Sequence, residues 1–357
     1  MRKLSTVRVI SNLSSIDGAD NIEVATVDGW KVVVRKGQFK EGDLCIYFEI
    51  DSFLPASDER FSFLEKNFRD WNGKRGARVK TIKLRGQISQ GVCLPISMFP
   101  EAHTLGVENH LDEALGVEKW EPAEIINRFG NAAGVFPWFI PKTDQERIQN
   151  RTEVLSDKNT EYQVTIKLDG CSMTVFAITR ESPYFNEMKE KDEFNLHEDV
   201  VFGVCSRNIL LKNDNNCFTK CAIDCGILNN MLEYALLTGD SFAVQGELVS
   251  PSIQGNHEKV DKTEFYVYNI FSIDSQEYVT PQTCWQVTQD MNLKHVPVLE
   301  NSWSIPNNWT IEDMLNYAEG QGMNEGVMRE GLVFKNKAFS ADSFKVISNS
   351  YLLKTGK

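Results

Sequence analysis

The stretch that most constrains the fold of this 357-residue chain lies at residues 162–178, which read YQVTIKLDGCSMTVFAI. Before Lys167, apolar and polar residues alternate with the period of two that is typical of a half-buried strand. Asp169-Gly170 is a strong turn signal, because glycine tolerates positive φ without steric cost. A second β-rich run follows the turn. The pattern therefore predicts a strand, a tight turn and a returning strand, with Lys167 near the rim of a sheet.

Lys167 has the setting of a nucleophile. Partial burial between apolar neighbours lowers the pKa of an amine and makes the reactive free base more accessible. A solvated turn lysine would have the same local sequence, so this stretch alone leaves both interpretations open.

Further segments follow the Lys167 stretch in a fixed order. They are Ser-Arg-Asn at 206–208, QGELV at 245–249, YNIF at 268–271, REGLVFK at 329–335 and FKVIS at 344–348. In this order the segments resemble the motifs of covalent nucleotidyltransferases, the polynucleotide ligases and mRNA capping enzymes. The resemblance spans roughly residues 140–357. It is closest to ATP-dependent RNA ligases that carry an OB-fold module in front of the catalytic domain.

The resemblance implies a three-step reaction. Lys167 would attack the α-phosphorus of ATP to form a lysyl-N–AMP, AMP would pass to an RNA 5′-phosphate, and a 3′-hydroxyl would displace AMP. The catalytic residues implied are Lys167, Asp169, Glu247, Glu330 and Lys345, the last neutralising the α-phosphate. The nucleotide-binding residues implied are Thr165, Ile166, Arg207 (ribose or phosphate), Phe271 (stacked on adenine), Val333 and Arg147 (triphosphate tail or RNA 5′-phosphate).

Three of these residues also suggest a metal. Carboxylates around a lysine favour its charged form, which cannot attack phosphorus. A divalent cation among Asp169, Glu247 and Glu330, held through water, would offset that field. Oxygen ligands and retained waters favour Mg²⁺ or Mn²⁺ over zinc.

The last motif departs from the family pattern. Many RNA ligases carry a second lysine two residues from the first, but here Ser343 and Ile347 stand at that spacing from Lys345. Lys335 and Lys354 are the candidates to replace it.

The amino-terminal hundred residues are β-rich. Strands are expected at 22–27, 30–34, 44–50 and 77–84, with turn signals between them, which favours a small closed barrel. Residues 19–27 resemble the opening of OB modules that bind tRNA. Six basic residues and no acid occur between positions 71 and 85, so a local RNA-binding surface is compatible with a net charge of −12. A solvated strand face is the alternative for this run.

We therefore expect an α+β fold in three parts. Residues 1–100 form an OB-fold RNA-binding domain, 101–140 a connector, and 141–357 an adenylyltransferase domain of antiparallel sheets with flanking helices. The polar stretch 182–199 suggests a mobile insertion. No apolar run approaches the ~20 residues of a membrane span, and no secretory signal is evident. A cytoplasmic monomer is expected.

The expected function is ATP-dependent sealing of RNA 3′-OH and 5′-phosphate ends, in a nicked duplex and in the service of RNA repair. A GTP-dependent capping guanylyltransferase or a DNA ligase is the enzyme alternative. Those enzymes commonly place the OB domain after the catalytic domain. A tRNA- or RNA-binding protein without activity is the non-enzyme alternative, and the intact set of Lys167, Asp169, Glu247 and Glu330 argues against it.

Overall fold

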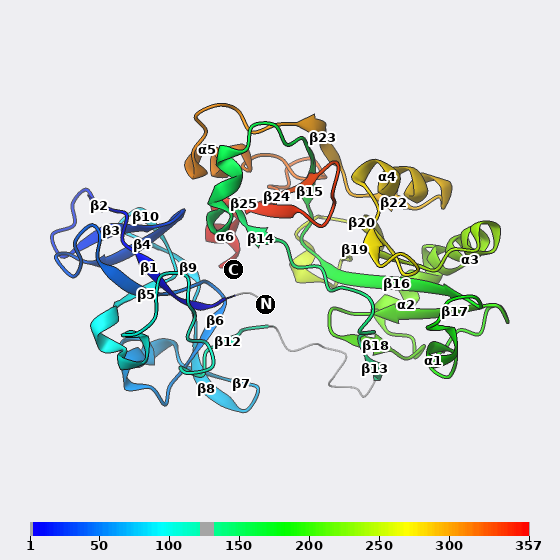
Figure 1. Cartoon of the computed structure of the whole chain (residues 1–357), viewed down its shortest axis with the longest axis horizontal. Helices are drawn as coiled ribbons and strands as arrows, with labels where there is room; N and C mark the ends of the chain where they lie inside the picture. The colour runs from blue at the N-terminus through cyan, green and yellow to red at the C-terminus, as the bar shows by residue number, and fades with distance from the viewer. Residues whose placement is uncertain (1–2, 122–131, 357) are drawn as a thin grey trace.

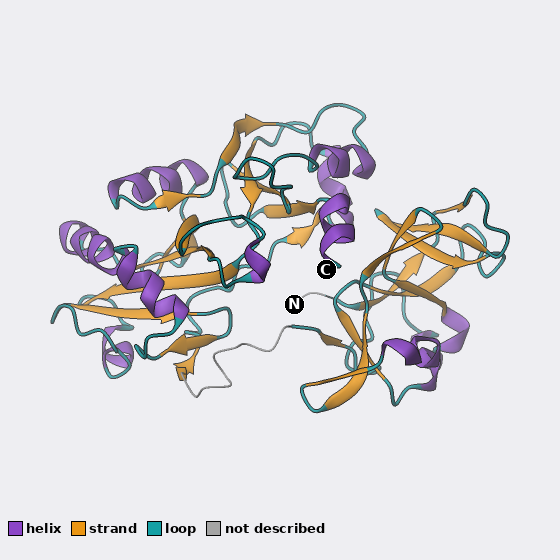
Figure 2. Ribbon diagram, turned by 180° about the vertical axis from the view of Figure 1, so that it is seen from behind, coloured by secondary structure: helices purple, strands orange, loops and turns teal. Residues whose placement is uncertain are grey.

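The computed structural model describes residues 3–121 and 132–356. Figure 1 shows the amino-terminal segments, in blue and cyan, as one body of strands beside a larger body that contains the rest of the chain. Figure 2 shows the same arrangement from behind, with helices confined mainly to the larger body. Antiparallel pairing dominates both bodies, which confirms the predicted α+β class.

The amino-terminal body is built from short antiparallel strands. The first sheet contains β1 (Ser5–Val9), β5 (Leu44–Phe48) and β11 (Val92–Pro95), and the second contains β2 (Asn12–Ser15), β3 (Ile22–Val27) and β4 (Trp30–Arg35). The third sheet contains β6 (Ser52–Pro55), β7 (Arg69–Trp71), β8 (Lys74–Arg78) and β12 (Glu118–Lys119). A hairpin is formed by β9 (Thr81–Leu84) and β10 (Gln87–Gln90). In β4 the alternate residues Trp30, Val32 and Val34 are buried in the common core. The predicted period of two thus gives the barrel its inner face.

The barrel core continues past residue 100. Leu111, Leu115 and Val117 are buried in it, and β12 pairs with β6. We therefore propose that the first domain ends near residue 120 rather than at 100. The middle of the predicted connector, at 122–131, lies outside the described residues.

The larger body contains two sheets. The β16 sheet has the order β13 (Ala132–Val135), β18 (Ile209–Leu211), β17 (Val200–Cys205), β16 (Cys171–Thr179), β19 (Phe242–Val249), β20 (Glu264–Ser272) and β21 (Glu277–Tyr278), with β22 (Lys294–His295) parallel to β20. The β15 sheet has the order β14 (Glu146–Arg147), β25 (Ser343–Ile347), β24 (Gly331–Asn336), β15 (Tyr162–Lys167) and β23 (Val298–Trp303). The chain passes from one sheet to the other at residues 168–170, the position of the predicted turn. The predicted returning strand is wrong, because β15 pairs with β23 and β24 whereas β16 pairs with β17 and β19 in the other sheet. Gly170 is also not among the glycines with positive φ in the described residues.

Helices flank these sheets. They are α1 (Phe185–Lys189), α2 (Cys217–Asp224), α3 (Ile227–Thr238), α4 (Pro281–Asp290), α5 (Ile311–Tyr317) and α6 (Asn349–Thr355). Residues of α2, α3 and α4 share one apolar core with Met173, Val175 and Val244 of the β16 sheet. Along the part of the chain that the structure describes, none of the helices combines the length and the apolar character needed to cross a membrane.

The barrel is docked against the β15 sheet and its helices. Trp30 Nε1 donates a hydrogen bond to Asn150 Oδ1 at 2.9 Å, and Asn150 Nδ2 donates to Glu49 Oε2 at 3.0 Å. Gln90 Nε2, at the end of β10, donates to Asn349 Oδ1 of α6 at 3.3 Å. The barrel therefore contacts the helix that follows the last motif.

Candidate active site

Strand register gathers four of the predicted residues on one face of the β15 sheet. Lys167 lies opposite Gly331, Thr165 opposite Val333, and Val333 opposite Lys345. Because side chains alternate along a strand, these residues share a face. Their even-numbered neighbours, Val164, Leu332, Phe334, Phe344 and Val346, fill the core on the other side.

Lys167 forms an ion pair with Glu330 on this face. Its Nζ lies 2.8 Å from Glu330 Oε2, and the two side chains are 23% and 13% exposed. Glu330 directly precedes Gly331, the strand partner of Lys167. A Cβ on Gly331 would lie 2.2 Å from Val346 O of β25, so only glycine allows β24 and β25 to approach this closely beside Glu330.

The turn after Lys167 is fixed by carboxylates. Gly170 N donates to Glu247 Oε1 at 3.0 Å, and Asp169 N donates to Glu258 Oε1 at 2.9 Å. The Asp169 carboxylate accepts a hydrogen bond from Tyr351 at 2.6 Å. Asp169 and Glu247 therefore lie where the two sheets meet.

The electrostatics of this cluster are dominated by negative charge. Burial alone would lower the pKa of Lys167, but the carboxylates of Glu330 and Glu247 outweigh it, so the pKa stands well above its ordinary value. Burial raises the pKa of Glu247 to about 8, against the opposing charge of Lys167. Burial also raises the pKa of Glu258. A divalent cation fits this oxygen-rich cluster, because its positive charge would lower the raised pKa values of both Lys167 and Glu247.

The cluster does not form a direct metal cage. Within residues 3–121 and 132–356, no group of three His, Cys, Asp or Glu side chains converges closely enough to hold an ion.

A second polar cluster brings Lys345 together with Arg207, another predicted residue. The Asp144 carboxylate lies 3.2 Å from Arg207 Nη2, 3.3 Å from Lys345 Nζ and 2.7 Å from Lys119 Nζ. Burial would raise the pKa of Asp144, but Lys345 and Lys119 lower it well below its usual range. Glu121, 3.4 Å from Arg207, adds a second carboxylate. Cations from three distant segments thus converge on one anionic group.

Three of the predicted nucleotide-binding residues belong to neither of these two polar clusters. Phe271 is 4% exposed and packs against Tyr278 in an apolar cluster. Ile166 points its side chain to the opposite face from Lys167, and its backbone N–H donates to Pro297 O. Arg147 is buried, with its guanidinium 5.7 Å from the ring centroid of Trp30 in the barrel.

The structure also gives the positions of Lys335 and Lys354, the two candidates to replace the second lysine of the last motif. Lys335 is 2% exposed, and its Nζ donates to Tyr268 O and to Asn269 Oδ1 across the gap between β24 and β20. Lys354 lies in the last turn of α6. Lys335 therefore links the two sheets, and the missing lysine of the last motif stays unassigned.

Several residues of the site carry no recognisable signal in the sequence. Tyr351 and Glu258 contact Asp169 across 182 and 89 positions, and Lys119 reaches Asp144 from the barrel strand β12. Asp144 stands in the polar run before the nucleophile strand, but its role as the shared anion depends on partners far away in the chain. Only the tertiary structure brings these groups together.

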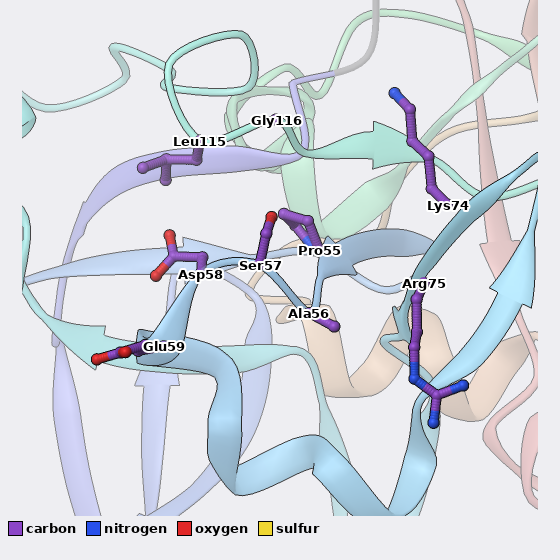
Figure 3. Close-up of a pocket in the computed structure, with 9 residues that line it drawn as sticks. All are labelled: Pro55, Ala56, Ser57, Asp58, Glu59, Lys74, Arg75, Leu115 and Gly116. Atoms are coloured by element: carbon purple, nitrogen blue, oxygen red, sulfur yellow. The ribbon is translucent and has the colours of Figure 1, made fainter.

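A pocket of about 810 Å³ lies in the barrel rather than at Lys167. Figure 3 shows Lys74 and Arg75 on one side of it and Asp58 and Glu59 on the other. None of the predicted nucleotide-binding residues lines this pocket. Its position separates it from the cluster around Lys167.

Comparison with known proteins agrees with this architecture. An OB-fold domain model matches residues 4–96, and an RNA ligase model matches residues 160–347, more than half of the chain. Among curated proteins, no sequence matches the chain.

Solved structures of Naegleria gruberi RNA ligase are similar over nearly the whole chain. A lysine-to-alanine variant with ATP and manganese is 39% identical, with 98% of both chains covered and a TM-score of 0.83. A lysine-to-methionine variant with AMP and manganese has the same identity and coverage and a TM-score of 0.85. The enzyme with pyrophosphate is 39% identical, with 99% of this chain and 98% of that chain covered and a TM-score of 0.84. The predicted combination of an OB fold and a ligase domain is confirmed, and the chain belongs to the RNA ligase family.

Proposed function

We propose that the protein joins RNA 3′-OH and 5′-phosphate ends in an ATP-dependent reaction that passes through AMP bound covalently to Lys167. The observation that carries this proposal is the ion pair of Lys167 with Glu330, at the junction of two sheets in an RNA ligase domain. The Naegleria relatives, solved with ATP, AMP and manganese, support ATP and a divalent cation as the requirements.

In the first step, Lys167 Nζ attacks the α-phosphorus of ATP. A nitrogen–phosphorus bond forms as the bond to the pyrophosphate oxygen breaks, and pyrophosphate leaves. Lys167 must lose a proton to attack, and Glu330 Oε2, at 2.8 Å, is placed to accept it. A Mg²⁺ or Mn²⁺ ion bound through water near Asp169, Glu247 and Glu330 would neutralise phosphate charge and lower the pKa of the lysine.

In the later steps, the AMP group passes from Lys167 to an RNA 5′-phosphate, and an RNA 3′-hydroxyl displaces AMP. Phosphate groups require cations close to the reacting atoms. Lys345, Arg207 and Lys119 supply three cations that converge on one point, now filled by the Asp144 carboxylate. We assign these cations to the phosphates of the nucleotide and of the RNA.

The barrel is the proposed RNA-binding surface. Of its six basic residues between positions 71 and 85, Lys74, Arg75 and Arg78 are paired with acids, whereas Lys80, Lys83 and Arg85 are exposed. The exposed three lie on and beside β9, and the adjoining β10 contacts α6 of the ligase domain. A nicked RNA duplex that spans the barrel and the ligase domain is the substrate we propose, for a cytoplasmic monomer that repairs RNA.

Labelling tests this proposal. Wild-type protein is incubated with [α-³²P]ATP or [α-³²P]GTP and Mg²⁺ or Mn²⁺, and then separated on a denaturing gel. We expect covalent label from ATP alone, followed by sealing of a 5′-phosphorylated nick in RNA. Label from GTP would support the capping alternative, and protein that binds RNA but takes no label would be an inactive binding protein.

A further inference from the structure

The carboxy-terminal helix α6 delivers a buried tyrosine to the turn beside the nucleophile. Tyr351 is 1% exposed, and its hydroxyl donates to Asp169 Oδ2 at 2.6 Å. The His257 ring packs edge-on against the Tyr351 ring, with the centroids 5.0 Å apart. A phenol this deeply buried needs a hydrogen-bond partner, and the side chain of Asp169 provides it.

The position of Tyr351 is fixed by the start of α6. Ser348 caps the helix by accepting a hydrogen bond from Tyr351 N at 3.0 Å, and its hydroxyl donates to Glu319 Oε2 at 2.8 Å. Ile347, Tyr351 and Leu352 pack together as a small buried cluster. The phenol is therefore held by its own helix and not by the Asp169 contact alone.

Glu258 and Tyr351 bind different parts of Asp169. Glu258 accepts from the Asp169 backbone N–H, while Tyr351 donates to the Asp169 side chain. The first contact fixes the turn, and the second fixes the rotation of the carboxylate. Asp169 stands two residues from Lys167, so its rotation decides where its charge lies relative to the amine.

We propose that Tyr351 is a positioning residue that acts on the reaction through Asp169. This role rests on the proposed function, because it assumes that Lys167 forms the adduct. Tyr351 itself exchanges no proton and forms no bond to the nucleotide. Its hydroxyl keeps the carboxylate in the orientation that the attack of Lys167 on ATP requires.

The test compares two full-length variants that each lose one hydroxyl. Tyr351→Phe keeps the ring and its contact with His257. Tyr266→Phe is the matched control, because it removes a phenol–carboxylate bond of the same 2.6 Å length, to Glu264, which is also paired with Lys294. Single-turnover adduct formation from [α-³²P]ATP should slow about tenfold in Tyr351→Phe, the loss expected for a hydrogen bond to a charged group. The KM for ATP and the melting temperature should match those of the control.

A double variant separates positioning from general structural damage. If Tyr351 acts through Asp169, then Tyr351→Phe should cause little further loss in an Asp169→Asn background. The same fold loss in both backgrounds, or a Tyr351→Phe rate equal to the control, would overturn the proposal. If Asp169→Asn forms no adduct, the single variant decides: a lower kcat alone supports the role, and a higher KM alone overturns it. Wild-type protein that takes no label overturns the proposed function and this role with it, whereas labelled wild type with unimpaired Tyr351→Phe overturns the role alone.

Discussion

Lys335 provides a test of the packing between the two sheets. Its ammonium is buried between β24 and β20, where it binds Tyr268 O and Asn269 Oδ1. Burial lowers the pKa of Lys335 from its ordinary 10.5 to about 8. Between these two values the unfolded chain binds more protons than the folded protein, so the contribution of Lys335 to stability becomes more favourable as the pH rises.

The size of the effect follows from the shift. A depression from 10.5 to about 8 disfavours the folded state by about 3 kcal/mol at neutral pH. At pH 9.5 the remaining cost is about 1 kcal/mol, because the folded protein holds Lys335 neutral and the unfolded chain has begun to lose its proton. Wild type should therefore gain about 2 kcal/mol over this range relative to a variant without the amine.

The variant Lys335→Met keeps the length of the side chain and removes the titrating group. Urea unfolding of both proteins, followed by fluorescence at neutral pH and at pH 9.5, gives the difference in the free energy of unfolding. The hydrogen bonds lost by Asn269 and Tyr268 shift this difference by an amount that is nearly constant with pH, so its slope reports Lys335 alone. A difference that does not change with pH would refute a lowered pKa and the burial from which it is derived.

Other changes test the rest of the site. Gly170→Ala should destabilise the protein by ~1–3 kcal/mol in thermal melts and block adduct formation, because the added Cβ would lie 2.3 Å from Leu248 O, whereas Gly134→Ala, with open space around it, should do neither. Glu330→Gln should slow adduct formation more than about tenfold, with partial recovery at higher Mn²⁺ concentration, and an unchanged rate would make Glu330 a structural carboxylate. Lys83→Glu should weaken RNA binding and reduce its salt slope by about 1 without affecting adduct formation, and it is compared with Lys220→Glu on α2 in binding titrations at several salt concentrations. Equal effects of the two charge reversals would argue against the barrel as the RNA surface.

The sequence predicts the parts of the site that depend on local pattern. The period of two before Lys167 correctly places Lys167 and Thr165 on one face and Val164 on the other. The break after Lys167 also follows from local sequence, but the returning strand does not, because β16 joins the other sheet. Gly170 is required by a contact across the chain, since a Cβ there would lie 2.3 Å from Leu248 O. The order of the motifs indicates that Glu247 and Glu330 lie near Lys167. In the structure Glu330 pairs with Lys167, and Glu247 accepts a hydrogen bond from Gly170 N.

Contacts between distant segments are beyond such reasoning. The Phe271 ring faces an apolar cluster because Tyr278 and the segment around Phe139 cover that part of the sheet. The stretch 182–199, expected to be a mobile insertion, contains α1, whose Phe185 and Met188 are buried. Two apolar side chains among many polar ones are too weak a periodic signal to predict a short helix.

The most direct measurement of the central claim is covalent labelling of Lys167→Met with [α-³²P]ATP beside wild type. Methionine keeps the length and apolar stem of the lysine side chain and removes only the amine, so the melting temperature should show that the fold survives. We expect label on the wild-type peptide that contains Lys167 and none on the variant. The variant should still join RNA that carries a preformed 5′-adenylate, because that step does not need the amine. A folded Lys167→Met protein that takes label from ATP would contradict the assignment of the nucleophile.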